Sequence, residues 1–195
     1  MNILFQKLPD SVSVHGKRYR IETDFREWIK LYELFEKTEK FNRQILDIIL
    51  DWYEVIPADE IAAVRALEKF MAGAPVPEPA AGDRKSPEKQ KIQKRNRRPV
   101  FSFAQDAVQI YAAFLAVYGI DIETVPYMHW WKFLILFEGL PENTEIKERI
   151  YYRSVDLKDI KSKEERKRIA EIKKRIELRN PARKLDAYQI GDVFA

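Results

Sequence analysis

The chain has 195 residues, of which 46% are hydrophobic and 34% are charged, and this length suits one substantial domain or two small ones. It contains no cysteine, which excludes disulfides and thiolate metal sites, and no apolar run reaches the length of a membrane span. The formal net charge of +4 is unevenly spread, because residues 74–99 alone hold eight Lys or Arg against three acidic residues.

The N-terminal part of the chain predicts a β-hairpin followed by a helix. Residues 12–22 read VSVHGKRYRIE, in which apolar residues flank a His-Gly-Lys turn. This is the pattern of a small hairpin, which must pack on a helix to be stable. Asp24 then stands where a helix N-cap is expected, and Glu27 completes a capping-box-like pattern. Apolar residues continue at helical spacing as far as Phe35.

Two further helices are predicted before a segment of different composition. One carries apolar residues from Ile45 onward and ends before Pro57, and the other runs from Ile61 to Met71. Residues 74–99, APVPEPAAGDRKSPEKQKIQKRNRRP, are then rich in proline and charge and poor in apolar side chains. Such a segment cannot bury enough surface to offset its loss of conformational entropy, so we predict a disordered basic linker.

Helical patterns return after this linker, and they include the most aromatic part of the chain. Gly119 and Gly139 are predicted stops, Pro126 is a predicted first helical residue, and Ser162 opens a capping box before a charged helix. The predicted helices span residues 104–118, 126–139, 143–152 and 162–179.

These elements predict a mainly α fold. We expect a helical bundle with a small N-terminal β-hairpin and a disordered basic linker between two helical halves. The predicted organisation is a hairpin and helical half over residues 1–73, a linker over 74–99, an aromatic-rich helical half over 100–160, and a charged helix and tail over 161–195.

The residues that usually carry catalysis or bind metals are scarce. The two histidines, His15 and His129, have no second ligand beside them at metal-binding spacing. For His129 we favour a narrow polar stripe on a buried helix over a catalytic role. The sequence also lacks the glycine-rich phosphate-binding loops and the nucleophile-elbow motif. We therefore expect no enzyme activity, no metal and no cofactor.

The basic run between residues 84 and 98 is the strongest indication of nucleic-acid binding. Its cations could neutralise phosphates and release counterions, but no aromatic residue interleaves them to stack on bases. A solvated, self-repelling linker is the alternative, and we favour it. The candidate nucleic-acid-binding residues are Arg84, Lys85, Lys94, Arg95, Arg97 and Arg98.

The aromatic helix predicted over residues 126–139 is apolar around most of its circumference. Such a helix is either central in a bundle or partly exposed to a partner, and the sequence leaves both interpretations open. Tryptophan, tyrosine and arginine are also the residues that anchor interfaces. Our candidate anchors are Trp130, Trp131, Phe137, Tyr152 and Arg153.

A narrow apolar stripe on the last predicted helix completes the set of candidate partner-binding residues. Ile169, Ile172 and Ile176 share one side of this charged helix. The stripe is too thin for a core face and suits a coiled-coil-like seam that binds another helix.

Several stretches of the chain resemble the bacteriophage gene-product-fifteen protein family of Gram-positive siphophages. The layout also matches, with an N-terminal helical half, a basic polar linker and an aromatic block, and the resemblance extends to about residue 175. The matching stretches are LPDSVSVHGKRYRIETDFREWIKL, FSFAQDAVQIYAAFLAVYGIDI, MHWWKFLILFEGLPENT and YYRSVDLKDI.

The resemblance implies a non-enzymatic tail assembly chaperone. Such a protein binds the tape-measure protein during tail morphogenesis and leaves before the virion is complete. The expected partners are the tape-measure protein, with the tail-tube protein and a second copy of this chain as further candidates, and no membrane. The expected location is the host bacterial cytoplasm and not the mature virion. A nucleic-acid-associated phage protein that uses residues 84–98 is the alternative.

Overall fold

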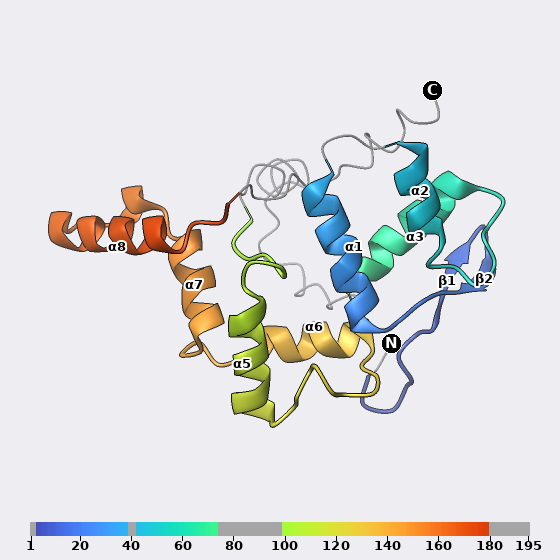
Figure 1. Cartoon of the computed structure of the whole chain (residues 1–195), viewed down its shortest axis with the longest axis horizontal. Helices are drawn as coiled ribbons and strands as arrows, with labels where there is room; N and C mark the ends of the chain where they lie inside the picture. Colours follow the sequence, from blue (N-terminus) through green and yellow to red (C-terminus); the bar gives the residue numbers. More distant parts are fainter. Residues whose placement is uncertain (1–2, 39–41, 74–98, 180–195) are drawn as a thin grey trace, which may run out of the picture.

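The structure is a computed structural model that describes residues 3–38, 42–73 and 99–179 (Figure 1). The described residues form a mainly helical fold with one N-terminal β-hairpin, which confirms the predicted fold class. The predicted linker lies outside the described residues, apart from Pro99, as does the tail after Arg179. The elements are β1 (Ser11–Val14), β2 (Lys17–Arg20), α1 (Phe25–Lys37), α2 (Arg43–Leu50), α3 (Glu60–Met71), α5 (Ala107–Tyr118), α6 (Trp130–Glu138), α7 (Glu145–Ser154), the 3-10 helix η1 (Leu157–Asp159) and α8 (Lys163–Arg175).

The predicted hairpin forms around a two-residue turn. His15 and Gly16 both adopt positive φ, 49° and 79°, as a type I′ turn requires. Val14 is paired with Lys17 in the antiparallel register and is buried, where the hairpin packs against α3. The hairpin is thus supported by a helix, as the short length of its strands demands.

The start of α1 uses a different acidic residue from the one expected. Asp24 is the N-cap, and its side chain accepts a hydrogen bond from the backbone N–H of Arg26, as predicted. The backbone N–H of Asp24, however, donates to the carboxylate of Glu22 at 2.7 Å. Glu27 instead pairs with Lys30 at 2.6 Å, so the predicted capping box is wrong. Glu22, two residues before Asp24, accepts from the Asp24 N–H, and Glu27 is left to pair with Lys30.

The aromatic helix α6 begins four residues later than predicted. Residues 126–129 are not helical, because they bridge to the start of α1 instead. The N–H of Phe25 donates to the carbonyl of Met128 at 2.9 Å, and the N–H of Trp130 donates to the carbonyl of Thr23 at 2.8 Å. Pro126 therefore does not start the helix, and His129 is the N-cap.

Helix α5 begins at Ala107 and not at Ala104, because the chain makes a turn first. In that turn the N–H of Asp106 donates to the carbonyl of Ser102 at 2.9 Å. The helix ends at Gly119, which adopts the left-handed conformation with φ of 64°, as glycine does at helix C-termini. At the other end of the chain α8 stops at Arg175, four residues before the predicted end.

One hydrophobic core joins residues from both sides of the predicted linker. Phe133 of α6 is fully buried and lies at its centre. Its ring centroid is 4.8 Å from that of Phe25 and 5.0 Å from that of Phe114, with both pairs stacked. Trp28 stacks on Trp130 at 6.2 Å. Helices α1, α5 and α6 therefore share a single aromatic core, while α8 projects from the body of the molecule (Figure 1).

Candidate protein-interaction surface

The two tryptophans predicted as interface anchors are core residues that also hold the end of α3. Trp130 is fully buried, and Trp131 is 8% exposed. The Trp130 indole N–H donates to the carbonyl of Met71 at 3.0 Å, and that of Trp131 donates to the carbonyl of Phe70 at 2.8 Å. Carbonyls in the last turn of a helix lack partners within the helix. The Trp130 indole supplies a partner for Met71. The Trp131 indole adds a second bond to the Phe70 carbonyl, which also accepts from the N–H of Gly73. Of the two interpretations left open for this helix, the structure places it in the core.

Phe137 and Tyr152 have different environments. Phe137 is buried against Phe101, with 5.2 Å between the ring centroids. Tyr152 is half-buried, and its ring lies 5.3 Å from that of Tyr151, which is 56% exposed. Of these two predicted anchors, Tyr152 therefore contributes to an aromatic pair at the protein exterior, on α7, whereas Phe137 belongs to the core.

Arg153 belongs to a buried ion-pair network. Its guanidinium donates to both carboxylate oxygens of Asp106, at 2.6 and 2.9 Å, and Arg149 reaches the same carboxylate at 3.3 Å. The Asp106 side chain is fully buried and that of Arg153 is 8% exposed. Arg153 also donates to the carbonyls of Val100 and Ile176 at 3.0 and 2.7 Å. This arginine thus fastens α7 to the start of α5 and to the end of α8.

The isoleucine stripe of α8 is partly buried by contacts with the rest of the chain. Ile169 is buried at 4% exposure, and Ile172 and Ile176 are half-buried. Helix α8 packs against α7, where Lys173 donates to the backbone carbonyl of Arg153 at 3.0 Å. Binding of a partner helix at this stripe stays a prediction.

The six basic candidates between Arg84 and Arg98 lie outside the described residues, so nucleic-acid binding also stays a prediction.

His129 acts as the N-cap of the aromatic helix. Its Nδ1 accepts a hydrogen bond from the backbone N–H of Trp131 at 3.0 Å, and its Nε2 lies 3.0 Å from the carbonyl of Pro9. These partners require a neutral ring with its proton on Nε2. Burial lowers the pKa of His129 below its ordinary value, because the charged ring would lose hydration.

This cap predicts a specific loss of stability in mild acid. The lowered pKa of His129 means that the unfolded chain binds the proton more tightly. The contribution of the neutral His129 ring to the free energy of unfolding is therefore complete well above pH 6.5, the unperturbed pKa. It is lost as the pH falls below that value towards the lower pKa of the folded state. We expect the free energy of unfolding, measured by urea titration, to fall between pH 7.5 and about 5.5 by more in the native chain than in His129→Asn. Asparagine is a suitable control because it can cap without titrating there. Parallel pH curves for the two proteins would contradict this role.

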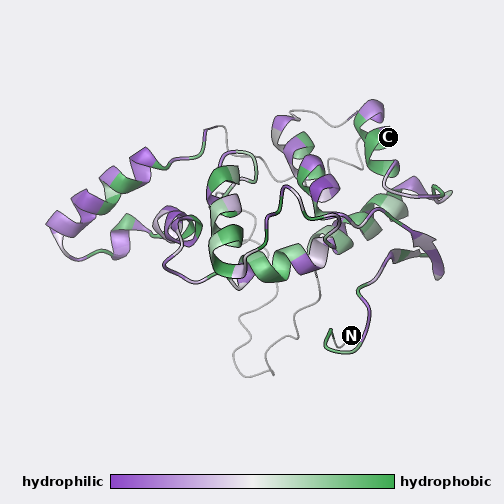
Figure 2. Cartoon of the chain, turned by 60° about the horizontal axis from the view of Figure 1, so that its bottom comes forward, coloured by the Kyte–Doolittle hydropathy of each residue, from purple (hydrophilic) through white to green (hydrophobic). Residues whose placement is uncertain are grey.

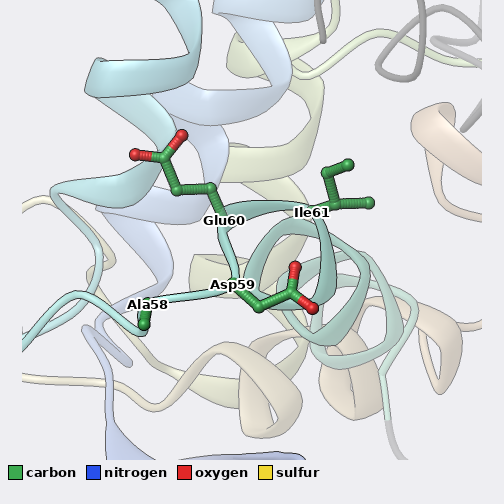
Figure 3. A pocket seen from close by; sticks show the side chains of 4 residues that line it. All are labelled: Ala58, Asp59, Glu60 and Ile61. Carbon is green, nitrogen blue, oxygen red and sulfur yellow. The ribbon is translucent and has the colours of Figure 1, made fainter.

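A shallow hollow at the start of α3 does not offer free acidic groups. It has a volume of about 400 Å³ and is lined by residues 58–61 (Figure 3). The Asp59 carboxylate caps α3 through the N–H of Ala62 and contacts His15 at 2.8 Å. The Glu60 carboxylate points away from the Asp59 carboxylate and binds the Arg43 guanidinium at 2.7 and 2.9 Å. Both carboxylates therefore serve local structure.

Among residues 3–38, 42–73 and 99–179, no group of three or more His, Asp or Glu side chains is arranged to hold a metal ion. None of the helices described here is both long and apolar enough to cross a membrane.

The strongest candidate site is the outer face of α5, which the sequence interpretation did not select. Helix α5 contains no charged residue, and its inner face packs into the core through Ile110 and Phe114. The opposite face is also apolar: Val108 is 73% exposed and Leu115 is 45% exposed, with the exposed Ala112 between them. In Figure 2 most of α5 is green or pale, whereas α8 is mostly purple.

The spacing of these residues suits contact with another helix. Val108, Ala112 and Leu115 follow one another at intervals of four and three, so they form one stripe along the helix. The small side chain of Ala112 lets a second helix approach closely between the two larger residues. We call these three residues the α5 stripe. The signal in the sequence was a twelve-residue helix without any charge, since a helix with one solvated face normally carries several.

The described residues define a class of protein: mainly helical, with an aromatic core and one helix whose outer face is apolar and exposed. A family model described as Bacteriophage Gp15 protein matches residues 4–178. The chain therefore belongs to the bacteriophage Gp15 family, and this membership implies a phage structural or morphogenesis protein. No curated protein and no solved structure matches the chain.

Proposed function

We propose that this protein is a non-enzymatic tail assembly chaperone that binds the tape-measure protein during phage tail morphogenesis. Family membership supports a role in building the phage particle. The observation that carries the proposal is the α5 stripe, an apolar surface on a folded helix that contains no charged residue. Exposed apolar stripes of this kind mark surfaces that bind amphipathic helices.

The small size of the α5 stripe fits a transient contact. A helix of twelve residues is about 18 Å long, so a partner helix would meet only three or four turns of it. Interfaces well below about 1,200 Å² in total are typically transient. A chaperone needs this property, because it must cover its client and then release it when the tail-tube subunits polymerise around it. The proposed site of action is the host bacterial cytoplasm, with the protein absent from the finished virion.

Co-expression with the tape-measure protein of the same phage tests this function. We expect the native chain to keep the tape-measure protein soluble and to co-elute with it. The double variant Val108→Asp and Leu115→Asp places two charges on the stripe and should reduce the co-eluting fraction at least tenfold. Val55→Asp is the matched control, since Val55 is 68% exposed but lies in the loop before α3.

Two results would contradict different parts of the proposal. A tape-measure protein that stays insoluble beside the native chain would overturn the chaperone function. Full co-elution with the double variant, if circular dichroism shows it folded, would overturn the assignment to the α5 stripe alone. Mass spectrometry of purified virions provides a further check, because recovery of this protein in stoichiometric amounts would indicate a retained structural component instead.

A further inference from the structure

The rest of the fold covers part of one edge of the hairpin and leaves the other edge open. On the β2 side, the N–H of Glu54 donates to the carbonyl of Arg20 at 3.2 Å, and the N–H of Glu22 donates to the carbonyl of Trp52 at 2.8 Å. An isolated bridge between Ile21 and Tyr53 lies between these bonds. The chain that follows α2 therefore covers the end of the β2 edge.

The β1 edge carries unpaired backbone groups. The N–H of Ile21 donates to the carbonyl of Asp10, so this facing pair is hydrogen-bonded. Hydrogen-bonded and non-hydrogen-bonded pairs alternate along an antiparallel ladder, so Ser11 and Ser13 direct their N–H and C=O groups away from β2. Among the residues that the structure describes, these outward groups have no hydrogen-bond partner. An edge of this kind is a template for another strand.

A groove runs along this open edge, between β1 and α3. Its volume is about 1000 Å³, and both Ser11 and Ser13 line it. On the α3 side the small side chains of Ala62 and Ala66 leave room beside the strand, and Phe70 adds apolar surface. An extended peptide beside β1 would thus lie over α3, with alternate side chains facing these residues.

The groove has a positive charge. Arg65 and Lys69, one helical turn apart on α3, both line it and both are exposed. Neither side chain forms a salt bridge within the described parts of the chain, and no acidic residue lines the groove. Two cations beside an open strand edge favour a peptide that carries carboxylates.

A second copy of the chain does not suit this groove. Two β1 edges paired antiparallel would place both α3 helices on the same side of the joined sheet. The Arg65 and Lys69 side chains of the two copies would then face each other, and like charges brought together in this way repel. Residues 74–99 are themselves basic, with eight Lys or Arg against three acidic residues, and are a poor match for the same reason.

We propose that the groove between β1 and α3 binds an extended acidic segment of a partner protein, which adds to the hairpin as a third strand along β1. The backbone groups of Ser11 and Ser13 would hold the added strand, and Arg65 and Lys69 would select its acidic side chains. This surface is separate from the α5 stripe, so the proposal does not depend on the tape-measure function.

Fluorescence anisotropy with the full chain tests the groove. The probe is a fluorescein-labelled eight-residue peptide of alternating valine and glutamate. We expect saturable binding that weakens as salt is added, and at least a tenfold loss of affinity in Arg65→Glu with Lys69→Glu. The same peptide with lysine in place of glutamate should not bind. Equal binding of both peptides, or no binding of the acidic one, would overturn the proposal.

A proline variant tests the strand edge itself. Ser13→Pro removes a backbone N–H that points away from β2 and so breaks no bond between the two strands, and proline is accepted on edge strands. We expect this variant to lose at least tenfold in affinity, while Ser13→Ala binds as the native chain does. Undiminished binding by Ser13→Pro would rule out strand addition. Tighter binding by a chain that ends at Arg179 would assign the groove to this protein's own C-terminal residues and overturn the partner proposal.

Discussion

Replacing Asp106 with alanine is expected to lower the free energy of unfolding by roughly 3–5 kcal/mol. Asp106 is fully buried, and its carboxylate is the anion that both Arg153 and Arg149 face. Its removal leaves the guanidinium of Arg153 buried at 8% exposure without a counterion, and such a group is costly to keep out of water. Urea unfolding followed by circular dichroism at pH 7 measures the loss.

Two comparisons separate burial of the charge from the ion pair as such. Glu145 also binds Arg149, at 2.7 Å, but its side chain is 63% exposed, so Glu145→Ala should lower the free energy of unfolding by less than about 1 kcal/mol. The double variant Asp106→Leu with Arg153→Met removes both charges and should be more stable than Asp106→Ala. If Asp106→Ala proves as stable as Glu145→Ala, the network does not hold α7 in place.

Replacing Trp130 with alanine is expected to lower the free energy of unfolding by about 3–5 kcal/mol. Trp130 has no exposed surface, stacks on Phe133 at 5.8 Å between ring centroids and donates its indole N–H to Met71. The loss therefore combines a large cavity with an unsatisfied carbonyl at the end of α3. The same urea titration measures it, with attention to whether the slope of the transition is unchanged.

The matched comparison for this loss lies on the candidate interface. Val108→Ala removes apolar surface that is 73% exposed, so it should change the free energy of unfolding by less than about 0.5 kcal/mol. A large loss in Val108→Ala would show that the outer face of α5 is covered in the folded protein, and the α5 stripe would no longer be a free surface. A small loss in Trp130→Ala would place this tryptophan outside the core.

The parts of the fold that the sequence predicted well are those governed by neighbouring residues. The His-Gly turn, the Asp24 cap and the stop at Gly119 each depend on a few adjacent positions, and the structure confirms all three. The start of α6 depends instead on bonds between residues 23–25 and 128–130, about a hundred positions apart. Residues 128 and 129 are held in this extended bridge and cannot be helical, although Pro126 favours a helix start.

The candidate interaction surface was harder to predict for a related reason. Trp130, Trp131 and Arg153 are residue types that serve equally in interfaces and in cores, and their partners decide which. Nothing near Arg153 in the chain points to Asp106, which lies 47 positions away. The α5 stripe was missed because valine, alanine and leucine are expected in a core, and only their exposure distinguishes them.

The shared aromatic core also affects how this protein is made. Phe25 and Trp28 of α1 are covered by Phe133 and Trp130 of α6, which leave the ribosome more than a hundred residues later. At about 5–20 residues per second, the first rings emerge roughly 5–20 seconds before the rings that cover them. During that interval the nascent chain displays aromatic side chains that the finished fold buries. The aromatic core of this protein can therefore form only after α6 has been synthesised.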